Sequence, residues 1–232
     1  MINSIDDSAF IKSADLKANN GDYQGAIDDY SKAIKINPDN AVVFYKRGIA
    51  KKAIKDFKGS LSDTNKASKI EQQHFEKLYK LAEKQLEALD HQGGIQSLTK
   101  ALSLNPNSSG AYFLRGIAKG QLELFAEAID DLSKAIDIKP DYSFCFYERG
   151  NNKLLIKDYF GAIEDCTKAL ELSNQDQIML DEIEKKSYLI RGMAKLALSN
   201  KEEGLVDLKL SELAGSDDAT EIIKLYSTNN NG

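Results

Sequence analysis

The chain has 232 residues, of which 42% are hydrophobic and 29% charged, and its formal net charge is −5. This composition is typical of a protein that buries a core, and the negative charge argues against nucleic acid, which binds basic surfaces. No apolar run approaches the roughly 18 residues of a membrane span, and no signal peptide is visible near Met1. We therefore expect a cytoplasmic protein that neither inserts into a membrane nor binds nucleic acid.

A period of 34 residues runs through most of the chain. The only three prolines, Pro38, Pro106 and Pro140, are separated by 68 and 34 residues. Aligned on this period, the eighth, twentieth and twenty-seventh positions hold only glycine, alanine or serine, which indicates helices in close contact. In chain order, the repeats are expected at residues 7–40, 41–74, 75–108, 109–142, 143–176 and 185–216.

Each repeat is predicted to form two antiparallel helices joined by a tight turn. In the first repeat, the turn is Asn20-Gly21-Asp22, and the second helix is expected to end near Pro38, because proline cannot continue a helix. The second repeat has Gln72 where the proline belongs. Eight extra residues, 177–184, precede the sixth repeat, and we expect them to lengthen its first helix so that it protrudes beyond its neighbours.

The C-terminal segment reads as a cap. Ala219, Ile222, Ile223 and Tyr226 follow helical spacing, and Ser216 can cap a helix over residues 217–226. Residues 227–232 are expected to be a disordered polar tail.

This pattern resembles the tetratricopeptide-repeat (TPR) family over about nine tenths of the chain. The best stretches are residues 21–38 and 128–140. The resemblance implies an all-α fold: a single right-handed superhelical solenoid of six antiparallel helix pairs, followed by the cap helix.

A charge pattern recurs with the repeat. Four repeats carry arginine at the seventh position, and each has an aspartate sixteen residues later; the third repeat has Leu81 and Ser97 instead. Pairing with the aspartate of the preceding repeat would place Arg115 opposite Ser97. We therefore predict structural ion pairs within repeats: Arg47–Asp63, Arg115–Asp131, Arg149–Asp165 and Arg191–Asp207.

The resemblance also implies a binding surface. In this family the first helices of the repeats line a concave face, and their second, fifth, sixth and ninth positions usually contact ligand. The last three of these positions predict a peptide groove formed by Tyr45, Lys46, Ile49, Tyr79, Lys80, Phe113, Leu114, Ile117, Tyr147, Glu148 and Asn151. A segment with apolar anchors, and with acidic residues toward Lys46, would fit such a groove. The alternative is that the aromatic residues at the fifth position only pack.

No catalytic, metal or cofactor site is expected. His91 and His74 lie at unrelated phases of the repeat, which does not make a metal site. Cys166 replaces a core residue, and nothing near Cys145 in the sequence supplies a catalytic base.

The sequence therefore favours a non-catalytic scaffold that binds a protein or peptide. A self-assembly module is the alternative, and an enzyme or small-molecule receptor is the third class. No three consecutive repeats carry the lysine and asparagine pattern by which some family members clamp the C-terminus of heat-shock chaperones, so that partner is not expected.

Overall fold

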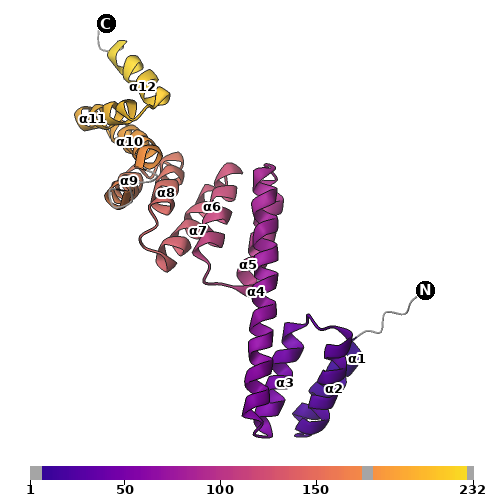
Figure 1. Cartoon of the computed structure of the whole chain (residues 1–232). Coiled ribbons are helices and arrows are strands. Elements are labelled where there is room, and N and C mark those ends of the chain that lie inside the picture. The colour runs from indigo at the N-terminus through magenta and orange to yellow at the C-terminus, as the bar shows by residue number, and fades with distance from the viewer. Residues whose placement is uncertain (1–6, 174–179, 229–232) are drawn as a thin grey trace. The chain divides into compact units, whose positions relative to one another are not determined.

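The computed structural model describes residues 7–173 and 180–228, which contain helices and turns and no strand. The helices are α1 (Ser8–Asn19), α2 (Tyr23–Ile36), α3 (Ala41–Ala53), α4 (Phe57–Glu87), α5 (His91–Leu104), α6 (Ser109–Gln121), α7 (Phe125–Ile138), α8 (Ser143–Leu155), α9 (Tyr159–Ser173), α10 (Leu180–Ala197), α11 (Lys201–Leu213) and α12 (Asp217–Thr228) (Figure 1).

The chain forms two compact units, with the boundary between Lys77 and Leu78, inside α4. In the N-terminal unit α1 packs on α2 and α2 on α3; in the C-terminal unit each helix from α5 to α12 packs on the next. The predicted all-α stack of antiparallel helix pairs is confirmed within each unit.

Small residues let the helices approach closely. Ala14, Ala26 and Ala33, at the eighth, twentieth and twenty-seventh positions of the first repeat, are fully buried. In the sixth repeat a Cβ atom added to Gly192 would lie 3.0 Å from the carbonyl oxygen of Gly204, so the two backbones nearly touch. Glycine in a helix costs about 1 kcal/mol relative to alanine, and close packing is the reason that it is tolerated here.

The structure joins the second and third repeats through one helix. A helix end was expected near Gln72, but α4 continues through this position and is 31 residues long. The expected boundary at residues 74 and 75 therefore lies inside a helix. The local reason is that residues 71–76, Glu-Gln-Gln-His-Phe-Glu, contain neither proline nor glycine to stop the helix.

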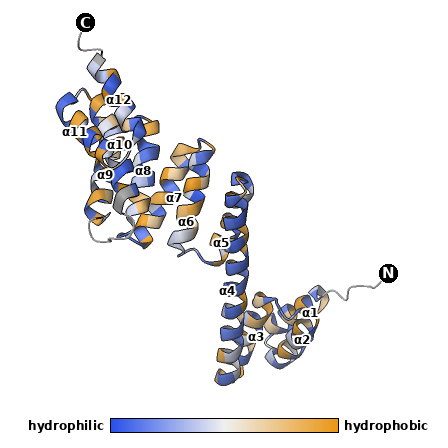
Figure 2. Ribbon diagram, turned by 45° about the horizontal axis from the view of Figure 1, so that its top comes forward, coloured by the Kyte–Doolittle hydropathy of each residue, from blue (hydrophilic) through white to orange (hydrophobic). Residues whose placement is uncertain are grey.

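Side chains at the stacking positions explain the division more deeply. The third and tenth positions are uncharged and buried in the second, fourth, fifth and sixth repeats, as in Ala111 and Ala118, but the third repeat places Lys77 and Lys84 there, both exposed. Stacking this repeat in the usual way would bury two ammonium groups, which is costly without paired charges. Figure 2 shows α4 as largely hydrophilic along its length.

The part of α4 that belongs to the second repeat is also polar where stacking needs apolar residues. At the twenty-fourth and twenty-eighth positions the fourth repeat has Leu132 and Ile136, whereas the second repeat has Thr64 and Ser68. Leu132 is fully buried, while Ser68 is exposed. Residues in both the second and the third repeat therefore depart from the usual stacking pattern.

The C-terminal predictions are resolved in part. Of the extra residues 177–184, the first three lie outside the described residues, and the remainder form the start of α10, whose 18 residues exceed the 13 of α8. The cap helix is α12, and Ser216 caps it by accepting a hydrogen bond from the Ala219 amide. Ser227 and Thr228, expected in the tail, belong to this helix; residues 229–232 lie outside the described part.

The structure brings together all four predicted Arg–Asp pairs. Each is bidentate: in the fourth repeat, Arg115 Nε and Nη2 donate to Asp131 at 2.8 and 2.6 Å. The same geometry joins the other three pairs, Arg47–Asp63, Arg149–Asp165 and Arg191–Asp207. The guanidinium also lies over the ring of the aromatic residue three positions earlier, 5.5 Å away for Tyr112. The pair therefore joins the two helices of one repeat.

Each arginine also reaches the preceding repeat. Arg115 Nη1 donates to Thr99 Oγ1 at 3.0 Å, and Arg149 Nη1 donates to Ser133 Oγ at the same distance. The preceding repeat thus supplies a hydroxyl group, not the carboxylate considered in the sequence analysis. One side chain ties together three helices.

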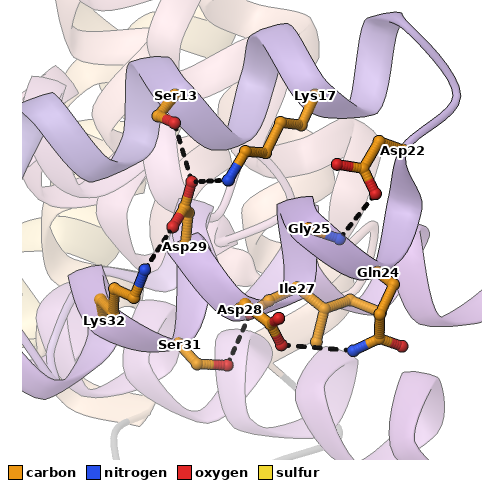
Figure 3. A network of polar contacts seen from close by, with 10 residues as sticks. All are labelled: Ser13, Lys17, Asp22, Gln24, Gly25, Ile27, Asp28, Asp29, Ser31 and Lys32. Carbon is orange, nitrogen blue, oxygen red and sulfur yellow. Dashed lines mark hydrogen bonds and ion pairs between the residues drawn. The ribbon is translucent and has the colours of Figure 1, made fainter.

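A lysine completes the network and was not predicted. Lys119 Nζ lies 2.9 Å from Asp131, and lysine occupies the same position in five of the six repeats, as Lys17, Lys51, Lys119, Lys153 and Lys195. In the first repeat, which lacks the arginine, Ser13 and Lys17 hold Asp29 (Figure 3). In the third repeat a neutral pair replaces the charges, because Ser97 Oγ donates to Gln85 Oε1 at 2.7 Å.

Arg115→Ala should lower the free energy of unfolding by about 3 kcal/mol, because it leaves a buried carboxylate with one partner fewer. The matched control is Lys168→Ala, whose ion pair with Glu171 is exposed and contributes about 0–1 kcal/mol. Chemical denaturation of both variants tests this. Equal losses in the two variants would contradict it.

The Arg47–Asp63 pair predicts that the N-terminal unit is sensitive to acid. Burial would raise the pKa of Asp63, but the hydrogen bonds from Arg47 and Lys51 outweigh it and hold the pKa below 3.8. A lowered folded-state pKa stabilises the fold above the unfolded pKa, and this contribution is lost as the pH falls through the folded value. Denaturation of Asp63→Asn between about pH 2 and 7 should show reduced stability at neutral pH and a shallower loss in acid. An acid dependence equal to that of the parent protein would refute the assignment.

Gln72→Pro should break α4 while leaving both cores folded. An interior proline costs a helix about 3 kcal/mol, and no residue from 71 to 73 is buried. Hydrogen exchange should become faster across residues 71–76, while protection at Leu98 and Ala14 is retained; Gln72→Ala is the control. Global unfolding, or unchanged exchange at residues 71–76, would contradict this.

Candidate functional site

The C-terminal unit contains a cavity of 390 Å³ between the first helices of three successive repeats, α6, α8 and α10. Four predicted groove residues line it, Phe113 and Ile117 from α6 and Tyr147 and Glu148 from α8. The other lining residues are Tyr142, Phe144, Glu182, Ile183 and Lys186. Helix α8 packs against both α6 and α10, which fixes the walls.

Four of the nine residues that line the cavity are aromatic. The rings of Phe113 and Tyr142 have centroids 4.9 Å apart, and those of Tyr142 and Phe144 are 6.1 Å apart in an edge-on arrangement. Tyr79, from the end of α4, lies beside α6, since a Cβ atom added to Gly110 would be 3.0 Å from its hydroxyl oxygen. The glycine leaves room for this hydroxyl group.

Glu148 is the acidic group of the cavity that is most affected by burial. Burial raises its pKa, and the opposing effects of Lys186 and of a hydrogen bond with Tyr147 do not cancel the rise. Glu182 differs, because hydrogen bonds from Lys185 and Lys186 lower its pKa to about 2. The cavity thus combines aromatic walls with two carboxyl groups in unlike environments.

The N-terminal unit has its own pocket of 350 Å³, lined by Asp15, Ala18, Asn19, Tyr23, Tyr30, Lys46, Ile49 and Ala50. Lys46 Nζ lies 2.7 Å from Asp15, and the Tyr30 hydroxyl donates to the same carboxylate at 2.6 Å. Burial would raise the pKa of Asp15, but these two hydrogen bonds outweigh it and lower the pKa. Because Lys46 is already paired, it is a weaker attraction for acidic ligand residues than its sequence position indicated.

The remaining predicted residues lie outside these two cavities. Tyr45 is 55% exposed, Lys80 is exposed, and Tyr79, Leu114 and Asn151 are half-buried. Tyr45 and Lys46 belong to the N-terminal unit and the others named here to the C-terminal unit. We therefore treat the predicted groove as two separate surfaces.

Sequence reasoning missed five of the cavity residues, although signals for them exist. Phe144 occupies the second position of its repeat, another position that contacts ligand in the resembled family. Tyr142 stands where Asn40 and Ser108 cap the preceding helices α3 and α6. Glu182 and Ile183 belong to the extra segment that was expected to extend α10, and they line the cavity at that end.

The two cysteines are removed from solvent. Cys145 and Cys166 are free and buried, and burial raises the pKa of the Cys145 thiol to about 12. Within residues 7–173 and 180–228, no group of three His, Cys, Asp or Glu residues could hold a metal ion. In the same part of the chain, no helix is both long and apolar enough to cross a membrane.

Known proteins match the repeats and the fold. A TPR repeat model matches residues 14–55, and a tetratricopeptide repeat model matches residues 109–142. No curated protein sequence matches the chain.

Several solved structures are similar. The crystal structure of MamA is 21% identical, with 89% of this chain and 96% of that chain covered and a TM-score of 0.51. The crystal structure of PilW, a type IV pilus biogenesis factor, is 16% identical, with 94% of this chain and 98% of that chain covered and a TM-score of 0.55. The TPR2B domain of yeast Sti1, in complex with pHsp70, is 20% identical, with 54% of this chain and 98% of that chain covered and a TM-score of 0.50.

The 34-residue period, the stacked helix pairs with small residues at their contacts, and the two matching repeat models agree. The chain belongs to the tetratricopeptide-repeat family.

Proposed function

We propose that this protein is a non-catalytic scaffold that binds an extended segment of another protein on the concave faces formed by the first helices of its repeats. The observation that carries the proposal is the cavity of 390 Å³ between α6, α8 and α10. Its volume lies within the range of ligand sites, and its walls are aromatic with a few polar groups.

The exposed residues of α3 support a second surface on the N-terminal unit. Tyr45 and Ile49 are 55% and 53% exposed, and Val42, on the same helix face, is 58% exposed. Exposed aromatic and aliphatic side chains at i, i+3 and i+7 form an apolar stripe of the kind that binding partners cover. The similar Sti1 domain, solved in a complex with pHsp70, is a precedent for a repeat of this fold holding a partner.

The test is the double variant Tyr79→Ala, Phe113→Ala. Truncating a hot-spot aromatic residue typically costs about 2 kcal/mol or more of binding, or about 30-fold in affinity. Quantitative affinity capture from the native lysate should therefore lose its specific partner with the double variant and keep it with Phe160→Ala. Phe160 is the control because it is 75% exposed and lies on the second helix of its repeat.

The opposite pattern, with the partner retained by the double variant and lost by Phe160→Ala, would overturn the concave-face assignment. Light scattering across protein concentrations separates binding of another protein from self-assembly. A mass that doubles with concentration, and stays monomeric in the double variant, would favour a self-assembly module instead.

A further inference from the structure

Helix α8, which lines the cavity, lacks the side-chain N-cap found in two equivalent helices. Asn40 and Ser108 cap α3 and α6 by accepting hydrogen bonds from the amides of Val43 and Ala111, but Tyr142, at the equivalent position before α8, forms no such bond. Losing an N-cap typically costs about 0.5–2 kcal/mol. Sequences tend to break such rules at functional sites. The ring of Tyr142 instead lines the cavity.

The aromatic rings around the cavity already attract cations of the chain itself. Lys139 Nζ lies 5.1 Å from the ring centroid of Tyr142, and Lys186 Nζ lies 5.5 Å from that of Tyr147. Both distances are within the range of cation–π attraction, which arises because the face of an aromatic ring is electronegative. The walls therefore favour positive charge near their faces.

The two carboxyl groups that line the cavity, Glu148 and Glu182, differ in their ionic partners. Glu182 pairs with both Lys185 and Lys186. Lys186 Nζ is 2.9 Å from Glu182. Among the residues that the structure describes, no lysine or arginine forms an ion pair with Glu148, whose burial raises its pKa. Glu148 is half-buried, and a carboxylate that is partly removed from water is stabilised by a paired charge, so an incoming cation would supply the ionic partner that it lacks.

We propose that the cavity between α6, α8 and α10 is a subsite for a lysine or arginine side chain presented by the bound segment. The proposal rests on the proposed function, since it names what the concave face of the C-terminal unit recognises. The apolar stem of such a side chain would contact Phe144, Ile117 and Ile183, while its charged end pairs with Glu148. An aliphatic side chain would leave Glu148 without an ionic partner, and an acidic one would add a like charge.

The test uses small probes on the full chain. N-acetyl-lysine methylamide and N-acetyl-arginine methylamide are titrated against N-acetyl-norleucine methylamide, which has an apolar side chain of similar length, while the resonances of Phe144 and Tyr147 are followed by NMR. Both cationic probes should bind about tenfold more tightly than the norleucine probe. Glu148→Gln, which keeps the shape and removes the charge, should abolish this preference. Glu171→Gln, an equal change at an exposed site on α9, should leave it intact.

Three outcomes overturn the proposal: no shift of these resonances with the lysine probe, equal affinity for norleucine, or an unchanged preference in Glu148→Gln. The comparison of probes on the unaltered protein holds even where a variant fails to fold. Failure here is distinct from failure of the proposed function. If partner capture depends on Tyr79 and Phe113 while no preference for cationic probes exists, only the cationic subsite is refuted. If cationic probes are preferred but partner capture does not depend on the concave face, only the proposed scaffold function is refuted.

Discussion

A helix pair of this kind cannot bury its own apolar face, and every other feature follows from that constraint. The chain solves it by stacking, with alanine and glycine where backbones approach and a bidentate arginine where three helices meet. Arg149 illustrates the arrangement, because its guanidinium joins Asp165 in its own repeat and Ser133 in the repeat before. A buried charge is stable only when its hydrogen bonds are satisfied, and stacking supplies the partners.

The residues of α4 illustrate the same need for stacking, because here the sequence departs from the repeat pattern. Where the contact between repeats lacks apolar residues, as at Thr64 and Ser68, the arginine and its aspartate are absent too, and Leu81 and Ser97 stand in their places. Leu81 is 48% exposed, whereas Arg115 at the same position is largely buried. The apolar stacking residues and the arginine–aspartate pair are therefore lost at the same point of the sequence, which is expected if each depends on the other for exclusion of water.

Much of the fold could be predicted from the sequence because a period repeated six times averages out local ambiguity. The ion pairs were predictable because Arg115 and Asp131 recur at one spacing. The lysines that join these pairs were equally predictable, because Lys119 occupies a position that is lysine in five of the six repeats. The continuous α4 was harder to predict, because it depends on residues such as Lys77 that replace the uncharged side chains usual at a stacking position. The cavity was partly predictable: Phe113 and Tyr147 follow from helix phase, but Tyr142 precedes its helix, and its position depends on a backbone turn that periodicity does not describe.

The ion pairs also bear on how the chain folds. Each of the four Arg–Asp pairs joins residues sixteen positions apart. Closing so short a loop costs little chain entropy, about 2.5 kcal/mol from the length-dependent part, and each doubling of the loop would add about 0.6 kcal/mol. Contacts this local give a low contact order, which correlates with folding in microseconds to milliseconds. The two helices of a repeat can therefore meet soon after their residues leave the ribosome, but the pair becomes stable only when neighbouring repeats have been made and can stack on it.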